Sequence, residues 1–224
     1  MTDSGAFQWN FSRPAKTLLL PLGNHLVLLS VNRSMRKRWK QLLLAFGLIC
    51  ALITAAALGL FKMAERHVAQ QLAPPDLQPF NPPRPLPYLS FTGLDGKVLP
   101  ISSLRGKVVF LDLWGTWCIQ CVAEMPTVQA LYNKFRNDPN VAFVIASRLD
   151  SPAAVRAYAR RHRYDLPFYI IDDRDVPPSM QLGQYPETFL ISRNGNLVAQ
   201  HTGGANWSAN SVVKTLKQLE ATPF

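Results

Sequence analysis

Apolar and polar positions divide the chain into two parts with different patterns. Residues 42–61 are twenty consecutive residues without a charge, whereas short apolar runs alternate with amphipathic segments from Tyr88 onward. A helix of about 20 apolar residues spans the roughly 30 Å core of a bilayer. The pattern therefore predicts a membrane helix over residues 41–62 and a separate folded domain over residues 88–224.

Two nearly continuous apolar runs in the second part are typical of strands buried on both faces of a sheet. They cover residues 107–114 and 141–146. Asp95-Gly96 and Asn194-Gly195 are strong turn signals, and each predicts a hairpin between its flanking segments. The remaining strands are expected at residues 89–92, 97–101, 168–171, 187–192 and 196–201.

Segments with helical spacing separate these strands. Residues 118–135 place apolar side chains on one side of a helix, and Ser151 before a proline predicts a helix that ends near His162. Ser208 is expected to cap a final helix ending near Glu220. The order of elements predicts an α/β fold, with a central mixed sheet and helices on both of its faces.

Positive charge is concentrated before the apolar run. Residues 1–87 hold 10 Lys and Arg against 3 Asp and Glu, and residues 88–224 hold 14 against 11. A nucleic-acid-binding protein should carry its basic surface on the folded domain, so we expect no such partner. The positive-inside rule places residues 1–40 in the cytoplasm and the domain outside it. The apolar run exceeds the roughly 7–15 residues of a signal peptide, which favours an uncleaved anchor.

Proline dominates the segment that joins the anchor to the domain, residues 63–87. Seven of the fourteen residues 74–87 are proline. Because proline fixes φ and lacks an N–H, neither helix nor sheet is expected there. Residues 74–87 are predicted to be a stalk of extended polyproline II, about 40 Å long.

Candidate chemistry lies in WGTWCIQCVAEMP, residues 114–126, where Cys118 and Cys121 stand between a predicted buried strand and a predicted helix. A zinc site needs four ligands, and a c-type haem needs histidine where Val122 stands. A structural disulfide closing so small a loop would contribute little. Free N–H groups at a helix start favour a thiolate on Cys118. The pair is therefore predicted to exchange disulfides, with Cys121 resolving the mixed disulfide.

Three blocks resemble the thioredoxin superfamily, in its membrane-anchored TlpA/ResA-like branch, across roughly residues 86–222. They are GKVVFLDLWGTWCIQCVAEMP, then FVIASRLD before a helix and DLPFYIIDD, and finally YPETFLISRNGNLV. The resemblance implies a thioredoxin fold and a redox-active disulfide Cys118–Cys121, with Cys118 the exposed nucleophile and Cys121 the buried thiol. It also implies that Pro186 is the family's cis-proline and that the backbone of Tyr185 pairs with a bound substrate strand.

Two acidic residues are candidates for proton transfer. Asp112 interrupts an apolar strand, where a carboxylate must titrate high or find a partner. By resemblance it matches the buried aspartate of thioredoxin, which assists proton transfer at the resolving cysteine, and Glu124 matches a glutamate near the ResA-like active site. The alternatives are a water-bridged Asp112 and a solvent-facing Glu124. Trp117 is expected to shape the active-site surface, and Trp114 to pack in the core or near the site.

The direction of exchange stays open, because Ile119-Gln120 lacks the proline that thioredoxin has between its cysteines. The reduction potentials of proteins with this fold differ by roughly 150 mV between thioredoxin and strong oxidants. Family analogy and Asp112 favour a reductase. No cofactor is expected, and the apolar run with its charge bias predicts a location in the inner membrane with the domain in the periplasm. Its partners would be exported protein disulfides, as in cytochrome c maturation, and a membrane thiol electron donor of the DsbD or CcdA type.

Two alternatives of another class remain. One is a thiol-based copper or haem chaperone, which predicts Met or His near the cysteines, and only Met125 is close in sequence. The other is a non-catalytic assembly module in which the cysteines are incidental.

Overall fold

The computed structural model describes residues 18–22, 25–29 and 33–222. The chain divides into two units, Met1–Gly59 and Leu60–Phe224. In the first unit, strands β1 (Leu18–Leu22) and β2 (His25–Leu29) pair in antiparallel fashion.

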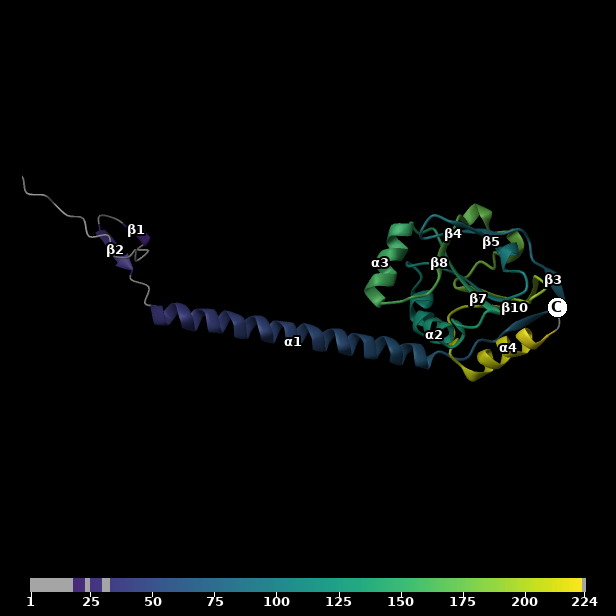
Figure 1. The fold of residues 1–224 in the computed structure, drawn as a ribbon, viewed down its shortest axis with the longest axis horizontal. Helices are drawn as coiled ribbons and strands as arrows, with labels where there is room; N and C mark the ends of the chain where they lie inside the picture. Colours follow the sequence, from purple (N-terminus) through teal and green to yellow (C-terminus); the bar gives the residue numbers. More distant parts are fainter. Residues whose placement is uncertain (1–17, 23–24, 30–32, 223–224) are drawn as a thin grey trace, which may run out of the picture. The chain divides into compact units, whose positions relative to one another are not determined.

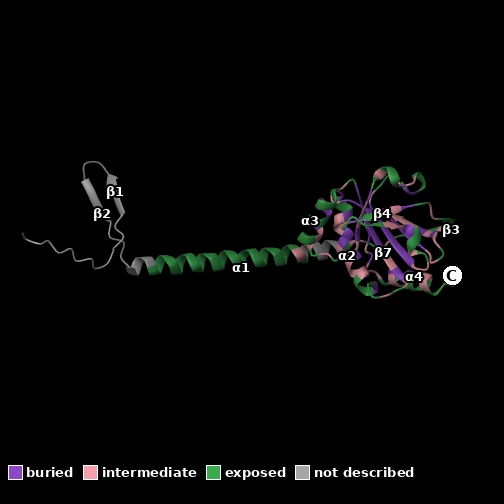
Figure 2. Cartoon of the chain, turned by 45° about the horizontal axis from the view of Figure 1, so that its top comes forward, coloured by how far each residue is buried: buried purple, intermediate pink, exposed green. Residues whose placement is uncertain are grey.

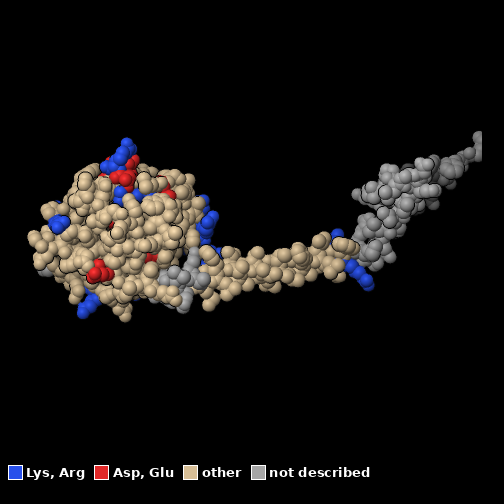
Figure 3. All heavy atoms as spheres, turned by 180° about the vertical axis from the view of Figure 1, so that it is seen from behind, with Lys and Arg blue, Asp and Glu red and all other residues tan. Residues whose placement is uncertain are grey.

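Helix α1 (Arg33–Gln71) contains the predicted span. Its stretch Lys37–Met63 is long and apolar enough to cross a membrane. The most apolar part of this stretch is not buried against other described residues. On the face in Figure 3, most of α1 shows neither blue nor red atoms. This helix is therefore a candidate membrane anchor. It continues beyond the expected end at residue 62 and stops shortly before Pro74, since a helix cannot run into a proline pair.

The second unit is built on one mixed sheet of eight strands in the order β3-β10-β9-β6-β7-β8-β4-β5 (Figure 1). The central strands β6, β7 and β8 are parallel, and β9 and β10 continue the sheet in antiparallel fashion. The bounds are β3 (Gln78–Pro85), β4 (Ser90–Gly93), β5 (Val98–Pro100), β6 (Val108–Trp114), β7 (Val141–Arg148), β8 (Phe168–Ile171), β9 (Glu187–Ile191) and β10 (Asn196–Thr202).

The two long apolar runs are the central strands β6 and β7, as the sequence predicted. Every residue of β6 is buried. Figure 2 shows buried positions along β7 and exposed ones on the outer side of α3. The predicted mixed sheet with flanking helices is therefore confirmed.

The helices of this unit are α2 (Ile119–Phe135), α3 (Pro152–His162) and α4 (Asn210–Ala221). All three bury side chains in one cluster with Phe110, whereas Leu111 belongs to a second cluster on the other face of the sheet. That face is covered by loops and the 3₁₀ turns η1 (Ile101–Leu104), η2 (Asp173–Asp175) and η3 (Pro178–Met180).

This arrangement differs from the expected α-helices on both faces. The chain passes from β6 through α2 to β7 and then through α3 to β8, moving in one direction across the sheet. Right-handed crossovers that progress in one direction place their helices on the same face.

The proline-rich segment is not only a stalk, and that prediction was wrong for residues 78–85. These residues form β3 at the edge of the sheet, where β3 pairs with β10. An edge strand pairs on one side only, so it tolerates residues that lack an N–H. The preceding segment also contacts the domain, because the Ala73 carbonyl accepts from the Asn206 N–H at 2.8 Å and the Asp76 carbonyl lies 3.0 Å from His201 Nδ1.

The two predicted helix caps have different outcomes. Ser151 caps α3, since its side chain accepts from the N–H of Ala154. Ser208 does not cap α4, whose N-cap is Ala209 without a side-chain hydrogen bond. The Ser208 hydroxyl instead donates to the Asn206 side chain at 2.7 Å, in the loop before the helix.

The role of β3 can be tested through Phe80, which is half-buried and packs against the cluster on the face opposite α2. We expect Phe80→Ala to lower the free energy of unfolding by about 1–2 kcal/mol, because part of the ring leaves apolar surroundings. Gln78→Ala, at an exposed position of the same strand, should change it by less than about 0.5 kcal/mol. Urea unfolding measures both changes. If Phe80→Ala changed the free energy of unfolding as little as Gln78→Ala, residues 78–85 would be a spacer that does not pack on the domain.

Candidate active site

The two cysteines lie where β6 ends and α2 begins. Cys118 is the N-cap of α2, and its Sγ accepts a hydrogen bond from the backbone N–H of Cys121 at 3.1 Å. The two residues form a disulfide with an S–S distance of 2.10 Å and a Cα–Cα distance of 5.2 Å. The helix start thus brings the pair together and directs an N–H group at the first sulfur, which would stabilise a thiolate there.

The exposure of the cysteines follows the expected order. Cys118 is 7% exposed and Cys121 is fully buried. Cys118 is nevertheless more enclosed than the exposed nucleophile that the resemblance implies, because the disulfide turns its Sγ toward Cys121. Of the two sulfurs, only that of Cys118 belongs to a residue with any contact with solvent.

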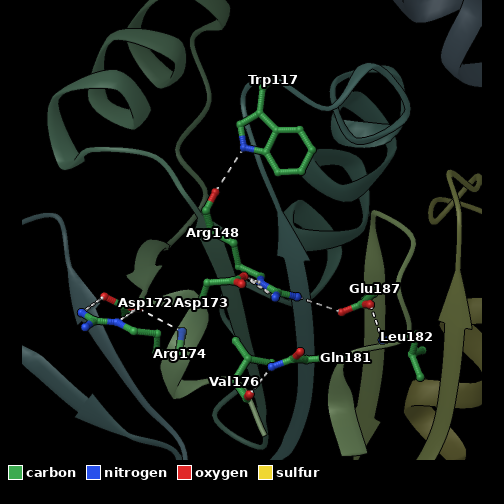
Figure 4. Close-up of polar contacts among 9 residues, drawn as sticks. All are labelled: Trp117, Arg148, Asp172, Asp173, Arg174, Val176, Gln181, Leu182 and Glu187. Carbon is green, nitrogen blue, oxygen red and sulfur yellow. Dashed lines mark hydrogen bonds and ion pairs between the residues drawn. The ribbon is translucent and has the colours of Figure 1, made fainter. Parts of the chain in front are cut away.

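A network of hydrogen bonds holds the loop before the cysteines. The Asp150 carboxylate accepts from the backbone N–H and the hydroxyl of Thr116, both at 2.7 Å, and from the Ser147 hydroxyl at 2.6 Å. The Trp117 indole N–H donates to the Arg148 carbonyl at 3.2 Å (Figure 4). The turn after β7 thereby fixes the active-site loop after β6.

The Tyr185–Pro186 peptide bond is cis, as the resemblance implied. The Tyr185 ring meets the Trp117 ring edge to face, with centroids 5.1 Å apart. Trp117 itself is 49% exposed, whereas Trp114 is fully buried in the core. The structure therefore brings Trp117, Tyr185 and Pro186 together and places Trp114 in core packing.

Asp112 lies on β6 and is fully buried on the side of the sheet that faces α2. Its Oδ1 accepts from the Thr188 hydroxyl at 3.1 Å. Burial raises the pKa of Asp112 to about 7, and the Thr188 hydrogen bond opposes this shift only in part. A carboxyl with such a pKa can accept or release a proton near neutral pH.

Glu124 lies on α2, and the alternative of a solvent-facing side chain was wrong, because the residue is fully buried. Its Oε2 accepts from the Ala205 N–H at 2.9 Å and from the Trp207 indole at 2.7 Å. Burial, followed by repulsion from the Asp112 carboxylate, raises the pKa of Glu124 well above its usual range, against the effect of these hydrogen bonds.

The two acids thus influence each other's charge on the helix-covered side of the sheet. Neither Asp112 Oδ2 nor Glu124 Oε1 has a hydrogen-bond partner within the described part of the chain. Two negative charges are unfavourable in so enclosed a region, so ionisation of both carboxyls at once is disfavoured. Glu124 can therefore hold a proton one helical turn after Cys121, and Asp112 can hold one on the same side of the sheet.

Sequence reasoning missed Asp150 and Arg148, although both stand in a block that carried the family resemblance. Both lie at the carboxyl end of the parallel strand β7, beside the carboxyl end of β6. Polar residues at this edge of a parallel sheet are frequent contributors to functional sites, and that position was the available signal. Gln120, which the sequence singled out only as part of the pair between the cysteines, has its backbone carbonyl close enough to Gly204 to leave little room for a Cβ there.

The fold and this site define a thioredoxin-fold protein with a cysteine pair at a helix N-terminus beside a cis-proline. The Redoxin family model matches residues 75–218. The chain therefore belongs to the Redoxin family of the thioredoxin superfamily.

Similar proteins carry related names. Thiol-disulfide oxidoreductase ResA of a Bacillus cereus strain is 30% identical over 162 residues, which cover 71% of this chain and 88% of the relative. ResA of Bacillus subtilis (strain 168) is 34% identical over 109 residues, or 49% of this chain and 60% of the relative.

Solved structures show the same fold. A Chlorobium tepidum protein described as thiol:disulfide interchange protein DsbE has a TM-score of 0.53 at 21% identity, and the match covers 62% of this chain and 97% of that chain. A Bacteroides vulgatus protein described as a thiol-disulfide oxidoreductase also has a TM-score of 0.53, at 24% identity, covering 60% and 94%. At this identity the likeness concerns the fold alone.

The raised pKa of Asp112 predicts a pH dependence of stability. The pKa of this carboxyl is about 7 in the folded state and near its ordinary value of 3.8 in the unfolded state. Between these values the folded state keeps a proton that the unfolded state has lost, so its contribution to stability falls as pH rises, by about 1.4 kcal/mol per unit at most. Asp112→Asn should therefore stabilise the oxidised protein at pH 8 and change little at pH 4.

Urea unfolding of the oxidised protein at both pH values measures this effect. The exposed Asp175→Asn is the matched control and should change the free energy of unfolding by less than about 0.5 kcal/mol at either pH. An equal effect of Asp112→Asn at pH 4 and pH 8 would contradict the shifted titration.

Proposed function

We propose that this protein is a membrane-anchored thiol:disulfide oxidoreductase that reduces disulfides of exported proteins. The observation that carries the proposal is the Cys118–Cys121 disulfide at the N-terminus of α2, with only Cys118 in contact with solvent. A purely structural disulfide does not need a backbone N–H that donates to its first sulfur. It also does not need buried acids on the side of the sheet where its second cysteine lies. The names of the ResA relatives support thiol-disulfide oxidoreductase activity.

The reaction begins with the reduced protein. The Cys118 thiolate attacks one sulfur of a substrate disulfide, which forms a mixed disulfide and releases one substrate thiolate. Cys121 then loses its proton and attacks Cys118 Sγ, which closes the internal disulfide and releases the second substrate thiolate. Each turnover oxidises one dithiol and reduces one disulfide, and the thiolates take up protons from solvent.

Asp112 and Glu124 have the properties needed for the second step. A thiol with an ordinary pKa near 8.5 needs a base of suitable strength when it is buried. Burial raises the pKa of Asp112 to about 7, which suits a base that accepts the Cys121 proton at neutral pH. Glu124 lies one helical turn after Cys121, and burial together with the Asp112 carboxylate raises its pKa well above its usual range.

The surface around Cys118 is suited to an apolar substrate segment. Ile119 is 86% exposed and Leu149 is 70% exposed. The Trp117–Arg148 and Thr116–Asp150 hydrogen bonds place the turn that carries Leu149 beside the active-site loop. Large apolar side chains exposed together on a folded domain mark interaction sites. An extended segment of a substrate protein, with apolar residues next to its cysteine, would cover them.

The proposed location follows from charge and length. Basic residues precede the candidate span in α1, so residues 1–40 would lie in the cytoplasm and residues 88–224 in the periplasm, with the protein held in the inner membrane. Cytoplasmic reductants do not reach that compartment, so a membrane thiol donor of the DsbD or CcdA type would reduce Cys118–Cys121. Candidate substrates are exported proteins with unwanted disulfides, including apocytochromes c.

A metal-handling role has less support. Within the described ranges, no group of three or more His, Cys, Asp or Glu residues is arranged to hold a metal ion.

The nucleophile can be tested by substitution in the full chain. We expect Cys118→Ser to abolish reduction of a protein disulfide, because no sulfur remains that a substrate can reach. Cys50→Ser, which removes the free and exposed cysteine of α1, should leave the rate unchanged. A thiol-release assay measures both, and substantial residual activity of Cys118→Ser would mean that the cysteine pair is incidental.

Substrates and topology can be tested with Cys121→Ala expressed in cells. Without the resolving thiol, the mixed disulfide at Cys118 should accumulate, and mass spectrometry would identify the attached proteins. The double variant Cys118→Ser/Cys121→Ala should capture none. Recovery of cytoplasmic proteins alone would contradict the proposed orientation of the membrane anchor.

A further inference from the structure

Arg148 and Glu187 form an ion pair that the reaction above does not use. Arg148 is 3% exposed and Glu187 is fully buried, and Arg148 Nη1 lies 3.2 Å from Glu187 Oε2. Arg148 Nε also donates to Asp173 in η2 at 2.7 Å, so the guanidinium is held between two carboxylates (Figure 4). A buried ion pair is often no more stabilising than apolar residues of similar volume, so a role other than stability is worth seeking.

The position of this pair connects it to the active site. Arg148 is the last residue of β7 and Glu187 is the first residue of β9, directly after Pro186. β6 runs between these two strands, with Leu113 opposite Glu187. The ion pair therefore crosses the sheet at the end of β6, where the chain leaves for Cys118.

Arg148 also contacts both aromatic residues beside the disulfide. Its guanidinium lies 4.8 Å from the centroid of the Tyr185 ring, within the range of a cation–π interaction. Its backbone carbonyl accepts from the Trp117 indole N–H, and the Trp117 and Tyr185 rings contact each other. One residue thus fixes both rings, through its side chain in one case and its backbone in the other.

We propose that Arg148 is a positioning residue that holds Tyr185 against Trp117 and thereby sets the affinity for extended peptide substrates. This inference rests on the proposed function. A peptide that reaches Cys118 must pass the surface made by the two rings. A small disulfide needs only the sulfur of Cys118, so its reaction should not depend on where the rings lie.

Glu187 contributes by holding the arginine. Its Oε2 binds the guanidinium, and its other oxygen accepts from the backbone N–H of Leu182. Both carboxylate oxygens of Glu187 are therefore held in place. Glu187 in turn holds the Arg148 guanidinium against the Tyr185 ring. Because Glu187 immediately follows Pro186, a change in the ion pair would shift the loop that carries Tyr185.

The test compares two substrates with the same leaving group in the reduced full-length protein. One is a ten-residue peptide with apolar residues around a cysteine activated as a mixed disulfide with thionitrobenzoate. The other is free cysteine activated in the same way. Each reaction oxidises one protein dithiol to the Cys118–Cys121 disulfide, and the released thionitrobenzoate is measured by its absorbance.

Arg148→Lys keeps the positive charge beside Glu187 but removes the planar group that packs on Tyr185. We expect it to raise the peptide concentration that gives half of the maximal single-turnover rate about tenfold, the loss expected for one desolvated cation–π contact, with the maximal rate unchanged. The reaction with activated cysteine should be unaffected. The matched control Arg174→Lys changes an exposed arginine paired with Asp172, and it should leave both substrates unchanged.

Glu187→Gln is the second variant and should raise the half-saturating peptide concentration by a smaller factor. Equal losses for the peptide and for activated cysteine, or no change in either, would overturn the positioning role. Failure of both variants to fold at 25 °C would also overturn it, since the pair would then serve folding alone. If the wild-type protein released no thionitrobenzoate from either substrate, the proposed function itself would fail.

Discussion

The start of α2 at Cys118 is the constraint on which the rest of the site depends. β6 has to end at Trp114 and the helix has to begin a few residues later, so that the first sulfur caps the helix and the second lies in its first turn. This geometry gives the two cysteines different surroundings. Cys118 receives an N–H and keeps contact with solvent, whereas Cys121 is enclosed on the helix-covered face with Asp112 and Glu124.

The alternation of side chains along the strands separates two tasks. Thr188 and Glu187 are neighbours on β9, and neighbouring residues of a strand point to opposite faces of the sheet. Thr188 faces the helices and contacts Asp112, while Glu187 binds Arg148 on the other face. One strand therefore supports the proton-holding acids on one side of the sheet and the ion pair behind the aromatic residues on the other.

The proline-rich segment shows how sheet position can override local preference. Seven prolines in residues 74–87 exclude a helix and a central strand, and this much followed from the sequence. An edge strand needs hydrogen bonds on one side only, and β10 offers that edge to residues 78–85. The pairing joins segments more than a hundred positions apart, so a local pattern could not reveal it.

The sequence by itself determined the candidate membrane helix, the central strands β6 and β7, the helices α2 and α3, and the position of the cysteine pair, because periodicity, turn signals and motif spacing are local properties. It also singled out Asp112, since one carboxyl in an apolar strand is conspicuous. Only the tertiary structure decided that α2, α3 and α4 share one face, that Glu124 is buried, and that Arg148 joins Glu187 to the two aromatic rings. These features depend on which strands become neighbours and which face each residue takes, and such contacts between distant segments form only when the sheet assembles.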